Sequence, residues 1–256
     1  MKHIAKIVTI ANQKGGVGKS TTADFLAEGL ALKGKRALLV DLDSQQSITL
    51  TAGADPDSPT SYELMLGQAS AKQAVQKREG RSDILPASRS LALLDTELTG
   101  AGRERRLRGA LEPILDAYDY VVLDTPPSLG IVTLSALTAA DLLVIPAQAD
   151  LYSLQGISQL YETVEAVRGH TNQALELAGI LLTRHQPRTI LSRDMSEAAA
   201  QAAEAMGTFL YKAFIREGVA VKEAQASQES IYAYAPKSKA ALGYMSFVEE
   251  FLERGF

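Results

Sequence analysis

Short runs of apolar residues alternate along the chain with longer segments in which apolar residues recur every three or four positions. The clearest runs occupy residues 7–10, 37–40, 120–123, 142–146 and 178–183, and a weaker one covers residues 83–87. Runs of this length and composition are typical of strands buried on both faces of a parallel sheet. The segment 19–33, with Ala23, Leu26 and Leu30 on one face, is typical of an amphipathic helix. The alternation predicts an α/β fold with a doubly wound, mostly parallel sheet.

The remaining segments add only short elements to this plan. Residues 62–67 and 71–77 predict two short helices, residues 103–115 predict a helix with several arginines near its start, and residues 51–60 predict a loop. No repeat, low-complexity tract or linker interrupts the pattern. We therefore expect a single domain over residues 1–256, without an N-terminal helix-turn-helix domain.

The loop after the first strand has the composition of a phosphate-binding loop. Gly15, Gly16 and Gly18 precede a helix that begins near Lys19. Glycines allow consecutive backbone N–H groups to turn toward an anion, and the start of a helix adds partial positive charge. In the strict Walker A pattern a glycine stands five positions before Gly18, where this chain has Gln13. The chain instead has a second lysine, Lys14, immediately before the glycine pair.

This segment, K-G-G-V-G-K-S-T-T, resembles the deviant Walker A motif of the ParA/MinD ATPases. A phosphate loop implies ATP and Mg²⁺ as ligands, with Lys19 on the β- and γ-phosphates and Ser20 on the metal ion. The resemblance implies that Lys14 reaches the nucleotide of a second subunit, so that ATP joins a homodimer. The expected nucleotide-binding residues of the loop are Lys14, Gly15, Gly16, Val17, Gly18, Lys19, Ser20 and Thr21.

Two aspartates at predicted strand ends complete the expected catalytic set. Asp124 follows the run at 120–123 and is itself followed by T-P-P-S, which resembles the switch II sequence of the family. Asp43 lies in D-L-D-S-Q-Q, which resembles the family's D-x-D-P-Q switch I with Ser44 in place of proline. The resemblance implies that Asp43 positions the attacking water, with Asp41 as a supporting carboxylate. The expected catalytic residues are Lys14, Lys19, Asp43 and Asp124, and the expected metal site comprises Ser20, Asp43 and Asp124.

The resemblance extends over the C-terminal half of the chain. The segment L-T-R-H-Q-P-R-T, residues 182–189, implies that Thr183 and Arg184 lie at the adenine side of the pocket. V-A-V-K-E-A-Q-A-S and Y-A-P-K-S-K-A-A also fit ParA proteins, which bind nonspecific DNA as ATP dimers. Arg188 matches one DNA-binding arginine of the family. The family's second basic site falls near Ala220, where this chain has alanine, with Lys222 two positions on. The candidate DNA-binding residues are Arg188, Arg193, Arg216, Lys222, Lys237 and Lys239, although a solvated surface charge is the alternative for each.

Composition narrows the classes of function. The chain of 256 residues is 46% hydrophobic and contains no cysteine, which excludes thiol catalysis and thiolate metal sites within it. The net charge of −4 leaves room for a local basic face. His3, His170 and His185 are too scattered to suggest a metal site, and we expect them at the surface. No signal sequence or long apolar run is present, so we expect a cytoplasmic protein that associates with the nucleoid when ATP is bound.

Three functions compete on this scaffold. The favoured one is a ParA-like ATPase for DNA partition, slow by itself and stimulated by a ParB-like adaptor. A MinD-like protein would dock on membrane through its C-terminal helix, but the apolar stripe here is surrounded by Glu249, Glu250 and Glu253, which disfavour anionic lipid. That stripe is predicted to pack on the core, and no membrane association is expected. An ATP-dependent metabolic synthase, such as one that makes dethiobiotin, is the third alternative. The apolar stripe of the predicted C-terminal helix, mentioned above, consists of Phe247, Val248, Phe251 and Leu252.

Overall fold

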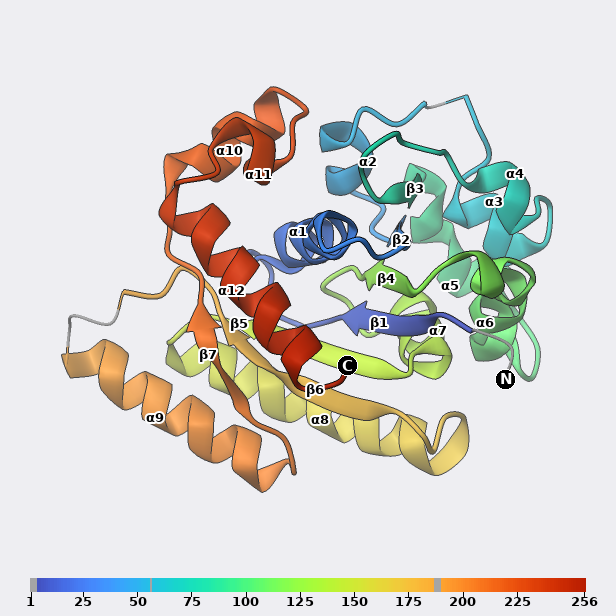
Figure 1. Ribbon diagram of the computed structural model, residues 1–256. Coiled ribbons are helices and arrows are strands. Elements are labelled where there is room, and N and C mark those ends of the chain that lie inside the picture. The colour runs from blue at the N-terminus through green and yellow to red at the C-terminus, as the bar shows by residue number, and fades with distance from the viewer. Residues whose placement is uncertain (1–3, 56, 187–189) are drawn as a thin grey trace.

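The computed structural model, which describes residues 4–55, 57–186 and 190–256, contains a parallel sheet of seven strands in the order β3-β2-β4-β1-β5-β6-β7 (Figure 1). Every strand pair within this sheet is parallel. The strands are β1 (Lys6–Ile10), β2 (Ala37–Asp41), β3 (Asp83–Leu85), β4 (Tyr120–Asp124), β5 (Leu142–Ala147), β6 (Glu176–Leu182) and β7 (Leu210–Phe214). The doubly wound α/β prediction is confirmed.

Helices cover both faces of the sheet (Figure 1). Helices α1 and α12 pack together on one face, whereas α7, α8 and α9 pack against β1, β5 and β6 on the other. The α-helices are α1 (Lys19–Leu32), α2 (Ser47–Thr51), α3 (Ser61–Leu66), α4 (Ala71–Ala74), α5 (Leu94–Glu97), α6 (Arg106–Leu111), α7 (Ile131–Ala139), α8 (Leu151–His170), α9 (Ile190–Ala205), α10 (Val219–Ala226), α11 (Ile231–Tyr234) and α12 (Lys239–Glu253). Short 3₁₀ turns cover Arg89–Leu93, Arg103–Arg105 and Glu112–Ala117.

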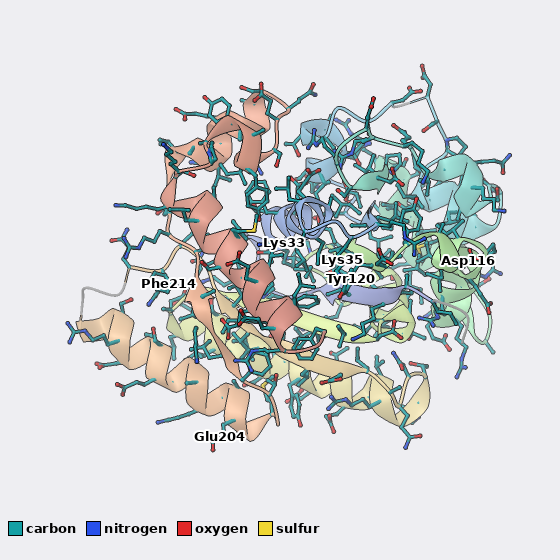
Figure 2. All side chains as sticks on the ribbon, in the orientation of Figure 1. Lys33, Lys35, Asp116, Tyr120, Glu204 and Phe214 are labelled. Atoms are coloured by element: carbon teal, nitrogen blue, oxygen red, sulfur yellow. The ribbon has the colours of Figure 1, made fainter. Side chains whose placement is uncertain are left out.

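The apolar strands supply both cores because successive side chains point to opposite faces of the sheet. In β1, Val8 joins the core beneath α1 and α12, while Ile7 joins the core on the opposite face. Leu39 and Leu38 in β2 divide in the same way. Side chains fill the space between sheet and helices on both faces (Figure 2). Strands that are buried on both sides leave their carboxyl ends as the place where polar side chains gather.

Two predicted helices differ from the structure, and one strand was not predicted. The predicted helix 71–77 ends at Ala74, and Gln76 instead pairs with Ile84 in an antiparallel bridge. The predicted helix 103–115 is divided into a 3₁₀ turn, α6 and a second 3₁₀ turn that contains Pro113. A proline lacks the N–H that would continue an α-helix, which accounts for the change at this point. Strand β7, which forms one edge of the sheet, was not predicted.

The C-terminal helix packs on the core, as its apolar stripe predicts. Phe247, Val248 and Phe251 are fully buried on the face of α12 that meets α1 and the sheet. A Cβ atom at Gly29 of α1 would lie only 2.6 Å from a Val248 methyl group, so glycine allows the two helices to approach closely. No helix in the described ranges is both long and apolar enough to cross a membrane.

Glu250 joins α12 to the edge strand β7. Its carboxylate accepts the backbone N–H groups of Lys212 and Ala213, each at 3.0 Å, and pairs with Arg254 at 2.8 Å. Burial alone would raise the pKa of Glu250, but the hydrogen bonds from Arg254 and the two backbone groups lower it below its ordinary value. The charged carboxylate therefore stabilises the edge of the sheet.

We expect Glu250→Ala to lower the free energy of unfolding by about 2 kcal/mol at neutral pH, because a charge-assisted contact to two backbone donors is lost. A pKa lowered by folding gives stability that is present above the ordinary value of 4.5 and lost as the pH falls through the folded value. The difference from wild type should therefore shrink in acid. Urea unfolding at neutral and acidic pH measures both effects. The control Glu249→Ala removes only an exposed ion pair with Lys33 and should cost less than about 1 kcal/mol; equal effects of the two variants would contradict the assignment.

Candidate nucleotide-binding site

The glycine-rich loop connects β1 to α1 at the carboxyl edge of the sheet. Gly16 and Gly18 have φ angles of +75° and +86°, a backbone region that disfavours other residues. Gly18 immediately precedes α1, so the N-terminal N–H groups of the helix face the loop. The loop borders a cavity of about 500 Å³, which Gly15, Gly16, Gly18, Lys19, Ser20 and Thr21 help to line. Val17 is fully buried and anchors the loop to the protein.

Lys19 lines this cavity, and buried Asp124 lies close enough to act on its charge. Lys19 is 7% exposed, and its amine donates to the backbone oxygen of Lys14 at 3.1 Å. Burial lowers the pKa of Lys19, whereas Asp124 and Asp43 act in the opposite direction. Asp124 ends β4 and is fully buried, and no group in the described part of the chain makes a hydrogen bond of normal geometry with either carboxylate oxygen. Burial, and then the neighbouring Asp41, raise its pKa well above the ordinary range, with Ser20 close enough to oppose the effect.

Asp41 organises the segment that carries Asp43. Its Oδ1 accepts the backbone N–H of Asp43 at 3.0 Å, and its Oδ2 accepts the backbone N–H and the hydroxyl of Thr49 at 2.9 Å and 2.8 Å. Burial raises the pKa of Asp41 to about 6, and its hydrogen bonds with Thr49 and Asp43 oppose the shift. Asp43 itself lines the cavity and accepts the N–H of Gln45 at 3.0 Å. Asp41, the predicted supporting carboxylate, thus holds the backbone of Asp43 and the start of α2 in place, and we call this set of hydrogen bonds the Asp41 brace.

Lys14 is bound within its own chain. Its amine lies 2.7 Å and 2.9 Å from the two carboxylate oxygens of Asp150 and 3.3 Å from the hydroxyl of Ser153. Asn12 fixes the backbone of the same residue by accepting its N–H at 2.9 Å. The ion pair lowers the pKa of Asp150, although its partial burial acts in the opposite direction. Sequence reasoning missed Asp150, which lies 136 residues from Lys14 along the chain.

Thr183 and Arg184 lie beside the loop. The Thr183 hydroxyl donates to the backbone oxygen of Val17 at 2.7 Å, so it supports the loop directly. Arg184 has a φ angle of +50° and lines the main cavity. Both residues also line an adjoining cavity of about 120 Å³, whose walls include Ile215, Val221 and Tyr244. The two cavities meet at residues that they share, which are Gly18, Thr21, Arg184 and Gln225.

His185 corrects one prediction. We expected a surface residue, but His185 is only 6% exposed. Its ring nitrogens lie 3.2 Å from the Ser192 hydroxyl and 3.4 Å from the Ser196 hydroxyl, and it packs edge-on against Phe214. These contacts from α9 and β7 explain how an imidazole can be accommodated in the interior, where burial lowers its pKa. His170 is exposed, and His3 lies outside the described residues.

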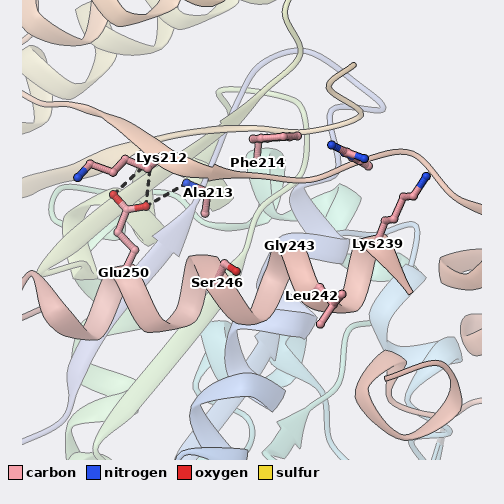
Figure 3. A pocket seen from close by; sticks show the side chains of 9 residues that line it. Lys212, Ala213, Phe214, Lys239, Leu242, Gly243, Ser246 and Glu250 are labelled. Atoms are coloured by element: carbon pink, nitrogen blue, oxygen red, sulfur yellow. Dashed lines mark hydrogen bonds between the residues drawn. The ribbon is translucent and has the colours of Figure 1, made fainter. Parts of the chain in front are cut away.

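Two of the six candidate DNA-binding residues line one groove between β7 and α12. Arg216 and Lys239 help to line this groove, which has a volume of about 520 Å³. Figure 3 shows Lys212 and Lys239 toward opposite ends of it, with Glu250 bonded to the backbone of Lys212 and Ala213. Lys212 was not predicted, because it belongs to the strand that sequence reasoning missed. The remaining candidates are exposed Arg193 on α9, Lys222 on α10 and Lys237 before α12, while Arg188 lies outside the described residues.

The site has the features that a magnesium nucleotide requires. The loop and the start of α1 offer N–H donors to phosphates, and the buried carboxylate of Asp124 accepts no hydrogen bond of normal geometry from the described residues. Buried charges are normally paired or bound to metal, so Asp124 fits a hard cation beside Ser20. The doubly wound sheet and this loop define a P-loop nucleotide-binding protein of the α/β class.

Comparisons with known proteins assign the family. A family model described as "AAA domain" matches residues 5–177. The sporulation initiation inhibitor protein Soj of Bacillus subtilis is 38% identical over 257 residues, covering 98% of this chain and 100% of that protein. The chromosome partitioning protein ParA of Caulobacter vibrioides is 37% identical over 255 residues, covering 97% and 94%. The chain belongs to the ParA group of the ParA/MinD P-loop ATPases.

A solved structure extends the comparison to bound ligands. A protein from Mycobacterium smegmatis described as cobyrinic acid a,c-diamide synthase, with bound ADP and magnesium, superposes with a TM-score of 0.81. It is 32% identical, and the match covers 98% of this chain and 96% of that one. Nucleotide and magnesium therefore occur together in a protein of the same fold.

Proposed function

We propose that this protein is an ATP-dependent dimerising switch for DNA partition. The observation that carries the proposal is the pair of lysines on one phosphate loop. Lys19 is buried beneath the cavity, whereas the amine of Lys14 is held outside it by Asp150. Once released from Asp150, this amine could reach across a twofold axis, and nucleotide would then be part of a dimer interface. The relatives named for chromosome partitioning support this function over the alternatives.

Each residue of the site has a role in this proposal. The backbone N–H groups of residues 15–21 and the amine of Lys19 would bind phosphate oxygens, and Ser20 and Asp124 would hold the metal ion. Bound Mg²⁺ would neutralise charge that develops on the phosphates. Asp43, held by the Asp41 brace, would orient a water molecule for attack and help to hold the metal ion. Positioning and charge neutralisation supply most of the catalysis in phosphoryl transfer, so no covalent protein intermediate is needed.

Asp150 restrains Lys14 in the isolated chain, so we expect Asp150→Asn to favour the dimer. The amide removes the charge but can still cap α8, because Asp150 accepts the N–H of Ser153 at 2.9 Å. A partly exposed ion pair is worth up to about 1 kcal/mol, and each dimer breaks two of them, so the dimer dissociation constant with ATP should fall by up to roughly thirtyfold. Analytical ultracentrifugation measures the change. Glu165→Gln on the same helix removes an exposed pair with Arg168 and is the control; an unchanged dimer affinity in Asp150→Asn would show that Lys14 is not restrained.

Sedimentation with DNA or with anionic liposomes, each with ATP and with ADP, tests the function. We expect ATP-dependent sedimentation with DNA that weakens steeply with salt, because phosphate contacts release counterions. Arg216 and Lys239 line the groove that we propose as the DNA surface, with Lys212 beside them. Sedimentation with liposomes instead would favour the MinD-like alternative. Binding to neither, by a protein that stays monomeric with ATP, would favour a metabolic ATPase.

The proposed cycle ends when a ParB-like adaptor stimulates hydrolysis. ADP lacks the γ-phosphate, so Lys14 would lose its contact with that group across the dimer, and the pair with Asp150 could form again. The dimer separates and releases DNA. The cargo is the DNA or assembly to which the adaptor is attached.

A further inference from the structure

Two glutamines at the ends of α2 have a backbone conformation that glycine normally occupies. Gln46, directly before α2, has a φ angle of +57°, and Gln228, in the turn after α10, has a φ angle of +55°. In the described ranges, the other non-glycine residue with a positive φ angle is Arg184, which lines the main cavity. Such conformations cost free energy and persist at functional sites, where surrounding contacts compensate for the cost. For both glutamines the compensating contact joins α2 to another part of the protein.

Gln46 joins the start of α2 to the segment after β3. Its side-chain amide donates to the backbone oxygen of Ala87 at 3.0 Å. The backbone N–H of Ala87 donates in turn to the hydroxyl of Thr49 at 2.8 Å, so both polar backbone groups of this buried residue are bonded to the segment 46–49. The backbone oxygen of Asp43 accepts the N–H of Gln46 at 2.9 Å. A shift of Gln46 would therefore displace Asp43.

Gln228 holds the other end of α2. Its side-chain amide donates to the backbone oxygen of Leu50 at 2.8 Å. The backbone oxygen of Gln228 accepts from Arg81 at 3.4 Å, and Arg81 pairs at 3.1 Å with Glu28 on α1. Glu28 is only 2% exposed. An ion pair to a buried carboxylate thus helps to fix the glutamine that holds α2.

We propose that Gln46 and Gln228 are positioning residues for ATP hydrolysis, because their side-chain amides fix α2 at both ends and thereby hold Asp43 at the main cavity. The Asp41 brace makes the segment from Asp43 to Thr49 rigid, and the two amides attach that segment to the rest of the protein. Residues of α2 line the same cavity as the phosphate loop. The assignment of hydrolysis rests on the proposed function, whereas the attachment of α2 does not.

Substitution by glycine removes each amide without adding strain, because glycine adopts positive φ angles freely. We expect Gln46→Gly to lower kcat for ATP about fivefold and Gln228→Gly about twofold, since the first bond is partly buried and the second is exposed. The double variant should lose about tenfold. KM should stay within about twofold of wild type, because the phosphate loop is unchanged. The midpoint of thermal unfolding should change by less than about 3 °C, since relief of strain offsets the lost bond.

Hydrogen exchange of α2 in the full-length, nucleotide-free protein is the second readout. The backbone N–H groups of Leu50 and Ala52 donate to the oxygens of Gln46 and Ile48, so their exchange reports on opening of this helix. We expect exchange of these groups to be about fivefold faster in Gln46→Gly and about twofold faster in Gln228→Gly. A role in overall stability alone would change neither the exchange of α2 selectively nor kcat at constant KM.

A second substitution guards against effects of glycine itself. Gln46→Asn also tolerates a positive φ angle but has a shorter side chain, so it should repeat both effects of Gln46→Gly. Gln68→Asn makes the same change at an exposed position after α3 and should behave as wild type. Unchanged exchange of α2 in the Gln46 variants, or unchanged kcat, would overturn the proposal. Absence of ATP turnover in wild type would instead contradict the proposed function, and the exchange rates would still decide whether the two amides hold α2.

Discussion

Replacing Asp43 by alanine is expected to reduce ATP turnover by at least about a hundredfold while leaving an ATP-bound dimer on DNA. The reason is that the side chain acts on the attacking water rather than on the nucleotide, and misplacing a reacting group commonly costs about a hundredfold in rate. Binding should persist because the phosphate loop, Lys19 and Asp124 are unchanged. The backbone should also persist, since Asp41 still accepts the N–H of residue 43 at 3.0 Å.

Two measurements on the same sample check this expectation. Phosphate release gives the turnover rate, and sedimentation with DNA gives the bound fraction after prolonged incubation with ATP. Glu204→Ala, at an exposed position on α9, is the control and should behave as wild type. Rapid turnover by the Asp43 variant would remove this residue from the mechanism. Loss of ATP binding would instead assign it to the metal site alone.

Replacing Lys14 by alanine is expected to leave ATP binding intact and to abolish dimerisation and DNA binding. The amine of Lys14 is bound to Asp150 in the isolated chain, so ATP binding by one chain does not depend on it. In the dimer it would be a charge on the partner's phosphates in a site that excludes water. The loss of such a charge-assisted contact costs several kcal/mol, which corresponds to at least about a hundredfold in dimer affinity.

Light scattering with ATP and titration of ATP binding separate these two effects. The control is Lys35→Ala, an exposed lysine in the turn after α1. ATP-dependent dimers of the Lys14 variant would contradict its proposed role. A failure to bind ATP would show that Lys14 acts within its own chain.

The fold could be predicted because most strands are apolar on both faces. β2 and β4 are buried at every position, so each is a continuous apolar run that ends in an aspartate. β7 could not be predicted in this way, since it lies at the edge of the sheet and Tyr211 is the one fully buried residue of its five. Because β7 was not predicted, Lys212, a basic residue of this strand that lines the groove, was not predicted either.

The phosphate loop could be predicted because its residues are consecutive, whereas its partners are distant. Asp150 and Thr183 contact the loop across 136 and 166 residues, so no local pattern marks either contact. The prediction for His185 was wrong for the same reason. The three histidines are far apart in the sequence, so we expected His185 at the surface. Ser192 and Ser196 of α9 and Phe214 of β7 instead surround its ring in the folded protein. The residue type alone carries no information about such neighbours.

The brace at Asp41 has a mechanical consequence. Its two oxygens hold residue 43 and the first turn of α2 together through three hydrogen bonds, all in the interior. Unfolding residues 43–49 would leave the Asp41 carboxylate buried without its hydrogen bonds. That is far more costly in free energy than a rotation of the whole segment as a rigid body. The end of β2, Asp43 and α2 should consequently move as one rigid unit, rather than unfold and refold at each turnover.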